Sequence, residues 1–458
     1  MELELNTVQQ IIEIVGEDNV LTNLEERICY SYDGTFQRGI PELVVFPANT
    51  QEVAEIVKLA NKEKFPVFPR GAGTGLSGGS IPMSSGVALV LTRMNKIKEI
   101  NSEDMLAVLE PGVITGHFNQ EVEKLGLYYP PDPASLKTCT MGGNIAENAG
   151  GPRAFKYGVT KDYVLGLEVV TPQGEIMHTG GRTVKNVTGY DLTRLLTGSE
   201  GTLGIITEIT VRLLPKPKEI RTALVIFDKL EDAASSVTAI IRNGVIPATL
   251  ELMDQIAIKC VENFNHLGLP LDAEAVLLIE VDGGKNQVEE DIISIEEICQ
   301  NHHCRKIHIA SLAEEREKLW KARRAVSSAI VQLKPTKISE DATVPRSKIP
   351  EMVKRLREIA SKYNLHIPVF GHAGDGNLHP NILADKNNKE EMERVQKAVD
   401  EIFHAALELR GTLSGEHGIG IMKKPYLQWE LGEVGIEYLR AIKRAVDPNN
   451  ILNPGKVF

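Results

Sequence analysis

Two histidines in one short segment have the spacing of metal ligands. The segment GHAGDGNLHP (371–380) places His372 and His379 on either side of Asp375-Gly376. An Asp-Gly pair between extended flanks predicts a two-residue type I′ hairpin turn. In such a hairpin His372 lies opposite His379, with Cβ atoms about 4.5–5.5 Å apart, so that both imidazoles can hold one metal ion. Two surface histidines on a hairpin remain the alternative for this segment alone.

A carboxylate and a third imidazole lie between glycines further along the chain. The segment SGEHGIG (414–420) contains Glu416 and His417. Neighbouring side chains on an extended backbone point to opposite sides, so these two are not expected to bind one ion in the same way. Considered alone, the segment is equally compatible with a glycine loop that carries a solvated carboxylate.

A glycine-rich segment near the N-terminus could bind phosphate. Residues 70–80, RGAGTGLSGGS, contain GTGLSG, which matches the dinucleotide fingerprint G-x-G-x-x-G. That fingerprint requires a helix directly afterwards and an acidic residue about 20 positions on. Gly79, Ser80 and Pro82 cannot sustain the helix, and residues 93–98 contain no acid. The segment therefore does not predict an NAD site of the Rossmann type, although a nest of backbone N–H groups remains possible.

Composition limits the class of protein. The chain has 458 residues, 42% of them hydrophobic, and a formal net charge of -11. This length predicts two or more domains, and the negative charge argues against nucleic acid or an anionic membrane as a partner. No apolar run reaches the roughly 18 residues of a membrane span, and the N-terminus reads as an acidic amphipathic helix. We therefore expect a cytoplasmic protein with no integral membrane segment.

The cysteines do not form a metal or disulfide framework. Cys29, Cys139, Cys260, Cys299 and Cys304 are odd in number and widely scattered, which argues against disulfides and against a four-cysteine iron–sulfur cluster. The segment CQNHHC (299–304) has no common zinc spacing. It is better explained as the end of a helix that leads into a strand at 306–309.

The hydrophobic pattern predicts mixed α and β structure. A strand at 42–46, a helix with Val53, Ile56, Val57 and Ala60 on one face, and a strand at 65–69 form a βαβ unit. Further strands are predicted at 87–91, 106–109, 164–170 and 175–178, with a helix at 115–125. Residues 130–160 form a long segment without periodicity, which is typical of a functional loop. After a Pro-Lys linker at 215–218, alternating strands and helices up to residue 371 predict an α+β sheet with helices on one face.

The glycine and histidine segments together resemble one family. They are PRGAGTGLSGG (69–79), DPASLKTCTMGGNIAENAGG (132–151), TGYDLTRLLTGSEGTLGIIT (188–207), and GHAGDGNLHPNI (371–382) with SGEHGIG. The combination resembles the FAD-linked oxidases and dehydrogenases of D-2-hydroxy acids, and the match runs from about residue 20 to DPNNILNPGK (447–456). The resemblance implies an α+β protein with a two-subdomain FAD-binding domain of the vanillyl-alcohol-oxidase (PCMH) type at 1–218. A ferredoxin-like substrate domain is expected at 219–410, and a C-terminal segment at 411–458 that returns to the FAD domain.

The resemblance also implies where FAD binds. The first glycine loop is expected to surround the FAD pyrophosphate with backbone amides. The loops at 132–151 and 198–206 are expected to complete the FAD-binding site. Residues 70–80 contain no histidine, so we expect non-covalent FAD. The residues that it assigns to the cofactor are Arg70, Gly71, Ala72, Gly73, Thr74, Gly75, Leu76, Asp132, Ser135, Thr138, Met141, Gly142, Gly143, Asn144, Asn148, Gly150, Gly158, Val159, Glu200, Gly204, Ile205, Ile206 and Asn453.

The same resemblance assigns the catalytic roles. It implies that His372, His379 and Glu416 bind a divalent metal, for which zinc, iron and manganese all suit the ligands. It further implies that His417 is the general base and that Arg323 binds the substrate carboxylate. Lys337 and Ser327 are weaker candidates. Arg324 competes with Arg323, because adjacent helical side chains lie about 100° apart and only one can face the site.

The expected function is the oxidation of a small D-2-hydroxy acid, D-lactate or glycolate. The metal is expected to hold the substrate hydroxyl, His417 to take its proton, and flavin N5 to accept the hydride. The expected electron acceptor is another polypeptide, either an electron-transfer flavoprotein or an iron–sulfur partner subunit. A D-2-hydroxyglutarate dehydrogenase, a redox-neutral alkyl-transferring FAD enzyme and a non-catalytic FAD-binding subunit remain alternatives.

Overall fold

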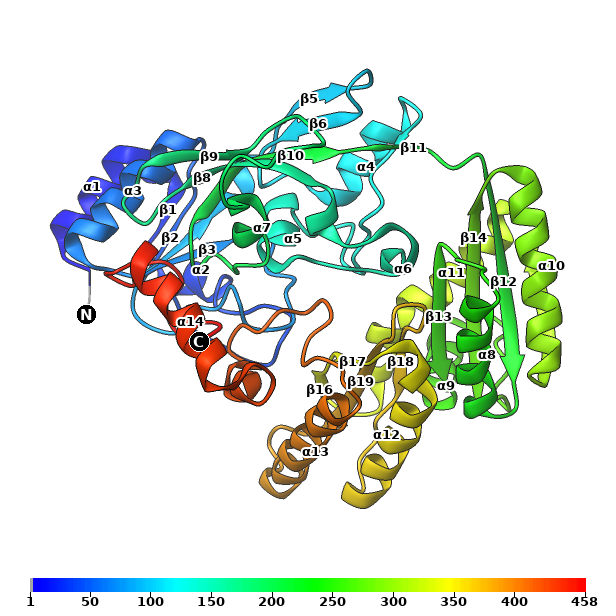
Figure 1. The fold of residues 1–458 in the computed structure, drawn as a ribbon. Coiled ribbons are helices and arrows are strands. Elements are labelled where there is room, and N and C mark those ends of the chain that lie inside the picture. Colours follow the sequence, from blue (N-terminus) through cyan, green and yellow to red (C-terminus); the bar gives the residue numbers. More distant parts are fainter. Residues whose placement is uncertain (1–2) are drawn as a thin grey trace. The chain divides into compact units, whose positions relative to one another are not determined.

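The computed structural model describes residues 3–458, which form two compact units (Figure 1). The first unit consists of the chain up to Ala149, Val159–Lys216 and Glu416–Phe458, and the second of Gly150–Gly158 and Pro217–Gly415. Residues 150–158 thus cluster with the second unit, although the first expected domain spans them. The chain enters the first unit again at Glu416.

The first unit begins with a small sheet built on a βαβ unit. Its strand order is β1-β2-β4-β3, and β4 pairs in parallel with both β2 and β3. Helix α3 (Thr50–Glu63) connects β2 to β3, and the Asn49 side chain caps it by accepting from the Glu52 amide. Val53, Ile56, Val57 and Ala60 of α3 are buried as predicted. The strands are β1 (Val20–Leu21), β2 (Leu43–Val45), β3 (Val67–Arg70) and β4 (Val87–Val90).

A second, antiparallel sheet of five strands also lies in this unit, beside a two-stranded pairing of β7 with β11. Its order is β5-β6-β10-β8-β9. Buried and half-buried residues alternate along most of β10, as expected where only one face packs on a core. The strands are β5 (Ile97–Asn101), β6 (Leu106–Leu109), β8 (Val164–Val170), β9 (Ile176–Gly180) and β10 (Ile205–Arg212).

Short elements and helices cover the rest of the first unit. The segment without periodicity at 130–160 contains two short helices, α5 (Met141–Glu147) and α6 (Ala154–Tyr157), the second of which lies in the second unit. The other elements are α1 (Leu5–Val15), α2 (Leu24–Ile28), α4 (Thr115–Glu123), β7 (Leu127–Tyr128), α7 (Leu192–Leu196), β11 (Leu214–Pro215) and α14 (Leu427–Val446).

The second unit is built on an eight-stranded antiparallel sheet. Its strand order is β15-β12-β14-β13-β18-β19-β16, and β17 pairs with β19 beside β16. The strands are β12 (Glu219–Phe227), β13 (Thr249–Asp254), β14 (Ala275–Gly283), β15 (Cys304–Ala310), β16 (Thr336–Ser339), β17 (Ala342–Thr343), β18 (Val369–His372) and β19 (Asn377–Ala384).

Helices cover both faces of this sheet, so the prediction of one covered face is wrong. All six residues of β13 are buried, which requires packing on both sides of the strand. Side chains of α9 and α11 form a core with Leu224, Met253 and Leu278, while α8 and α10 contact β12 and β14. The helices are α8 (Leu230–Arg242), α9 (Gln255–Asn265), α10 (Lys285–Asn301), α11 (Ala313–Ala329), α12 (Ile349–Tyr363) and α13 (Lys389–Glu408). Within residues 3–458, no helix combines the length and apolar character needed to cross a membrane.

Candidate active site

The hairpin β18–β19 brings the two predicted metal histidines together, but in a different register. His372 pairs with Asn377 and Phe370 pairs with His379, so the prediction that His372 lies directly opposite His379 is wrong. Four residues, 373–376, form the turn, and Gly376 adopts a φ of 87° that favours glycine. The two histidines occupy diagonal positions on one face of the hairpin.

The two imidazoles have the geometry of a shared metal site. Their ring centroids lie 5.0 Å apart, and the residues are 6% and 5% exposed. His372 Nδ1 lies 2.7 Å from Glu251 Oε1. An ionised carboxylate only accepts, so this Nδ1 carries the hydrogen and Nε2 is the nitrogen able to bind a metal. The donor set of two buried imidazoles therefore fits a divalent transition metal.

A buried ion pair lies beside this histidine pair. Glu251 on β13 is fully buried, and its Oε2 accepts from Arg323 Nε at 2.7 Å and forms an ion pair with Nη2 at 2.6 Å. Burial raises the pKa of Glu251, but the nearby charges of His372 and Arg323 outweigh this effect and bring it below its ordinary value. The guanidinium also lies over the Phe370 ring at 5.0 Å.

The structure distinguishes the two adjacent arginines of α11. Arg323 is 7% exposed and points into the second unit, whereas the exposed Arg324 pairs with Glu317 on the surface. Lys337 on β16 donates to Ser327 Oγ at 2.6 Å, which joins the two weaker candidates. Burial lowers the pKa of Lys337.

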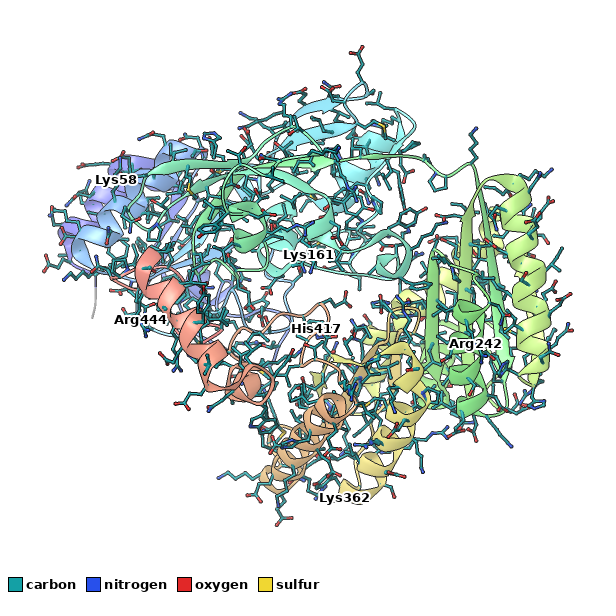
Figure 2. All side chains as sticks on the ribbon, in the orientation of Figure 1. Lys58, Lys161, Arg242, Lys362, His417 and Arg444 are labelled. Carbon is teal, nitrogen blue, oxygen red and sulfur yellow. The ribbon has the colours of Figure 1, made fainter. Side chains whose placement is uncertain are left out.

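Glu416 and His417 are the first two residues after the second unit ends at Gly415, where the chain returns to the first unit. Figure 2 labels His417. On the side of the second unit, Ser414 donates to Asp341 Oδ2 at 2.9 Å. Gly415 packs so closely on the hairpin that a Cβ there would lie 2.8 Å from Asn377 Nδ2. Glu416 is therefore one residue from a segment held against the histidine hairpin.

The other end of this segment is fixed inside the first unit. Glu200 accepts from the amides of Ile419 at 2.8 Å and Gly420 at 2.7 Å. The Glu147 carboxylate lies against Gly418, and burial, followed by the charges of Glu200 and Asp33, raises the pKa of Glu147 well above its ordinary value. Glu200 thus holds residues 416–420 through its side chain.

The glycine loop after β3 has the free amides that a phosphate requires. Among residues 3–458, no group accepts a hydrogen bond from the main-chain N–H of residues 71–76. Gly73 has a φ of 69°, and the Gly75 carbonyl accepts from Gly34 at 2.9 Å, which fixes the loop. At Gly75 a Cβ would meet only Glu147 Oε1, at 3.8 Å. The loop therefore fits a diphosphate bound through backbone amides.

The remaining assigned FAD residues fall into three groups. One group lies in the interior of the first unit, where Asn144 donates to Thr115 Oγ1 at 2.8 Å and Asn453 to the Gly79 carbonyl at 2.9 Å. The buried members are Met141, Asn144, Glu200, Gly204, Ile205, Ile206 and Asn453. The members with accessible atoms are Asp132, Ser135, Thr138, Gly142, Gly143, Asn148 and Val159. Gly150 and Gly158 belong to the second unit.

Two acidic side chains of the site were not found by sequence reasoning. Glu251 holds both His372 and Arg323, and Asp341 Oδ1 lies 3.9 Å from His379 Nδ1. The sequence did contain a sign of Glu251, since it is a charged residue inside the largely apolar strand TLELMD (249–254). A charge buried in such a strand needs hydrogen-bond partners or an opposite charge. For the segment 299–304, the described chain forms no group of three ligand-type side chains.

Comparisons with known proteins identify FAD-linked relatives over nearly the whole chain. Residues 41–180 match the FAD binding domain model, and residues 216–457 match the model for the C-terminal domain of FAD linked oxidases. The chain is 50% identical over 451 residues to glycolate oxidase subunit GlcD of Bacillus subtilis, covering 98% of this chain and 96% of that protein. It is 39% identical to D-lactate dehydrogenase of Anaerostipes hadrus, covering 97% and 94%.

Solved structures confirm the predicted fold. The structure of p-cresol methylhydroxylase with substrate bound superimposes with a TM-score of 0.81 at 20% identity, covering 99% of this chain and 96% of that one. Alkyldihydroxyacetonephosphate synthase gives a TM-score of 0.78 at 20% identity, covering 99% and 86%. At this identity the likeness concerns the fold alone. With its two domain matches and its full-length relatives, the chain belongs to the family of FAD-linked oxidases.

Proposed function

We propose that this protein is an FAD- and metal-dependent dehydrogenase that oxidises glycolate or D-lactate to the 2-oxo acid. The observation that carries the proposal is the buried arrangement of His372, His379 and Arg323, with the two imidazole rings 5.0 Å apart. A 2-hydroxy acid needs a site for its hydroxyl and a cation for its carboxylate, and this arrangement offers both. The relatives named glycolate oxidase subunit GlcD and D-lactate dehydrogenase support the substrate class.

Residues 71–76 would hold the FAD diphosphate through their main-chain amides, with the assigned residues of 132–159 and 200–206 around the rest of the cofactor. His372 Nε2, a His379 ring nitrogen and the Glu416 carboxylate would hold the metal, which we take to be zinc, iron or manganese. The proximity of Gly415 to Asn377 supports the third ligand. When bound, FAD supplies a two-electron acceptor and the metal supplies a Lewis acid.

The chain's own residues bind the substrate and move its proton. Arg323 uses Nε and Nη2 for Glu251, which leaves Nη1 for the substrate carboxylate. Lys337 supplies a second donor from β16. We assign the removal of the hydroxyl proton to His417, the imidazole that follows Glu416 in the chain.

We propose that the electrons leave through a partner protein, either an electron-transfer flavoprotein or an iron–sulfur subunit. The Bacillus subtilis relative is named as a subunit of glycolate oxidase. The G-x-G-x-x-G match of this sequence lacks the helix and the acidic residue of an NAD site, and the cysteines do not have the spacing of an iron–sulfur cluster. Flavin that substrate has reduced should then reoxidise slowly with NAD alone. Rapid formation of NADH by the isolated chain would contradict this proposal.

Turnover with a dye as electron acceptor tests which 2-hydroxy acid is the preferred substrate. Glycolate, D-lactate, D-2-hydroxyglutarate and L-lactate should be compared at equal FAD and metal content. The proposal predicts the highest kcat/KM for glycolate or D-lactate. A higher value for D-2-hydroxyglutarate would favour that alternative, since the D-2-hydroxyglutarate dehydrogenase of Stutzerimonas stutzeri is 34% identical to this chain. Turnover of L-lactate at the same rate as D-lactate would contradict the assigned site.

A further inference from the structure

Glu251 is a charged side chain in a place where the fold otherwise puts apolar ones. It lies in the middle of β13, whose six residues are all buried, and its own exposure is 0%. Its strand partner on β18 is His372. A buried carboxylate is tolerated only when hydrogen bonds and opposite charge satisfy it.

The two oxygens of Glu251 serve two different groups. Oε1 lies 2.7 Å from His372 Nδ1, while Oε2 accepts from Arg323 Nε at 2.7 Å and forms an ion pair with Nη2 at 2.6 Å. Arg323 is fixed further by the Phe370 ring, 5.0 Å away. Nη1 of Arg323 donates to no residue within 3–458. One carboxylate therefore orients both the imidazole and the guanidinium.

We infer that Glu251 is a positioning residue that couples metal binding to substrate binding. It keeps the hydrogen of His372 on Nδ1, so that Nε2 can bind the metal, and it orients Arg323 so that Nη1 can meet the substrate carboxylate. The inference rests on the proposed function, because it assumes that His372 is a metal ligand and Arg323 a substrate ligand.

If Glu251 orients both His372 and Arg323, the effect of Glu251→Gln on metal binding should depend on whether Arg323 is present. In Glu251→Gln the side chain has one accepting oxygen and one donating NH₂. The guanidinium only donates, so Arg323 takes the oxygen and the NH₂ faces His372. Nδ1 must then accept, the hydrogen moves to Nε2, and the metal loses its ligand. Removing Arg323 as well frees the amide to rotate, and its oxygen can again accept from Nδ1.

The test measures Zn²⁺ binding by equilibrium dialysis on the FAD-loaded full chain. Glu251→Gln should bind Zn²⁺ about 10- to 100-fold more weakly than the wild type, as is usual when a partner of a metal-bound histidine is lost. Arg323→Met should keep its Zn²⁺ affinity and raise KM, and the double variant Glu251→Gln/Arg323→Met should recover most of its Zn²⁺ affinity. FAD content, which depends on the first unit, should stay unchanged in all three.

Failure of the role inferred for Glu251 and failure of the proposed metal-dependent function give different results. Wild-type Zn²⁺ affinity in Glu251→Gln, or no recovery in the double variant, overturns the coupling. Should Glu251→Gln fail to fold, Glu251→Leu/Arg323→Met buries no unpaired charge, and its Zn²⁺ affinity must fall about 10- to 100-fold below that of Arg323→Met. Equal affinities in that pair also overturn the inference. A wild-type chain that binds no Zn²⁺ and turns over without metal overturns the proposed function together with the inference.

Discussion

The glycine loop offers a substitution that separates folding from FAD binding. At Gly75 the backbone does not adopt a positive φ, and an added Cβ would make only an ordinary contact with Glu147 Oε1 at 3.8 Å. Gly75→Ala should therefore leave the apoprotein as stable as the wild type, or stabilise it by about 0.4–1 kcal/mol. Because the amides of 71–76 have no partner in residues 3–458, the new methyl group should affect only a ligand that approaches them.

The expected loss follows from the hydrogen bonds at stake. A hydrogen bond to a charged group contributes about 1.5–3 kcal/mol. Losing one such bond to the diphosphate therefore raises the Kd of FAD about 10- to 100-fold. The assay is titration of the apoprotein with FAD, followed by the quenching of flavin fluorescence, with thermal unfolding of the same apoprotein measured in parallel.

Two further glycines serve as comparisons. Gly73→Ala should lower both stability and FAD affinity, because Gly73 has a φ of 69° and a Cβ there would collide with Arg70. Gly126 has a φ of 71° with no atom within 4 Å, so Gly126→Ala carries the backbone strain alone. It should lose stability but keep wild-type FAD affinity. If Gly75→Ala bound FAD as tightly as the wild type, the diphosphate would not lie on residues 71–76.

Three other predictions follow from the same structure. His379→Ala should lose metal and turnover together, whereas His417→Ala should keep FAD and metal while kcat falls about 10²- to 10⁴-fold; metal loss in His417→Ala with retention in His379→Ala would reverse the assigned roles. Burial lowers the pKa of Lys456 to about 8, so the unfolded chain binds more protons between pH 8 and 10.5, and the contribution of Lys456 to the free energy of unfolding rises with pH across that range. Lys456→Met should therefore be more stable than the wild type below pH 8, and this advantage should shrink by up to about 3 kcal/mol as the pH rises to 10.5. Denaturant unfolding of the two apoproteins measures the difference in the free energy of unfolding. A difference that does not change with pH would contradict the lowered pKa of Lys456. Acid denaturation should release FAD into solution, and flavin that stays with the precipitate would show a covalent bond and direct attention to Cys139.

The sequence correctly predicted that His372 and His379 lie close together, although the predicted hairpin register was wrong by two residues. The Asp-Gly signal favoured a two-residue turn, whereas the hairpin uses four residues and pairs His372 with Asn377. This difference shifts the pairing by two residues, and a shift of two keeps every side chain on its original face. His372 and His379 therefore still meet, as diagonal instead of direct neighbours.

Other features depended on tertiary contacts that a local pattern does not contain. The helical position of Arg323 and Arg324 left both orientations open, and burial against Glu251 and Phe370 decides between them. Glu251 itself comes from a strand 72 residues away from Arg323 in the chain. The apolar strand at 275–281 suits a sheet covered on both faces, but hydrophobic runs alone did not reveal which helices cover it.

The most direct test of the central claim is anaerobic reduction of the bound flavin by D-lactate and L-lactate, on one preparation with its metal intact and after removal by a chelator. We expect full two-electron bleaching of the flavin by D-lactate in the metal-loaded protein, a large loss of rate after chelation, and recovery when the metal is restored. L-Lactate should cause no comparable bleaching. Flavin that D-lactate and glycolate both leave oxidised would contradict the account and favour a redox-neutral enzyme of this fold, and an equal rate without metal would contradict the role of His372 and His379.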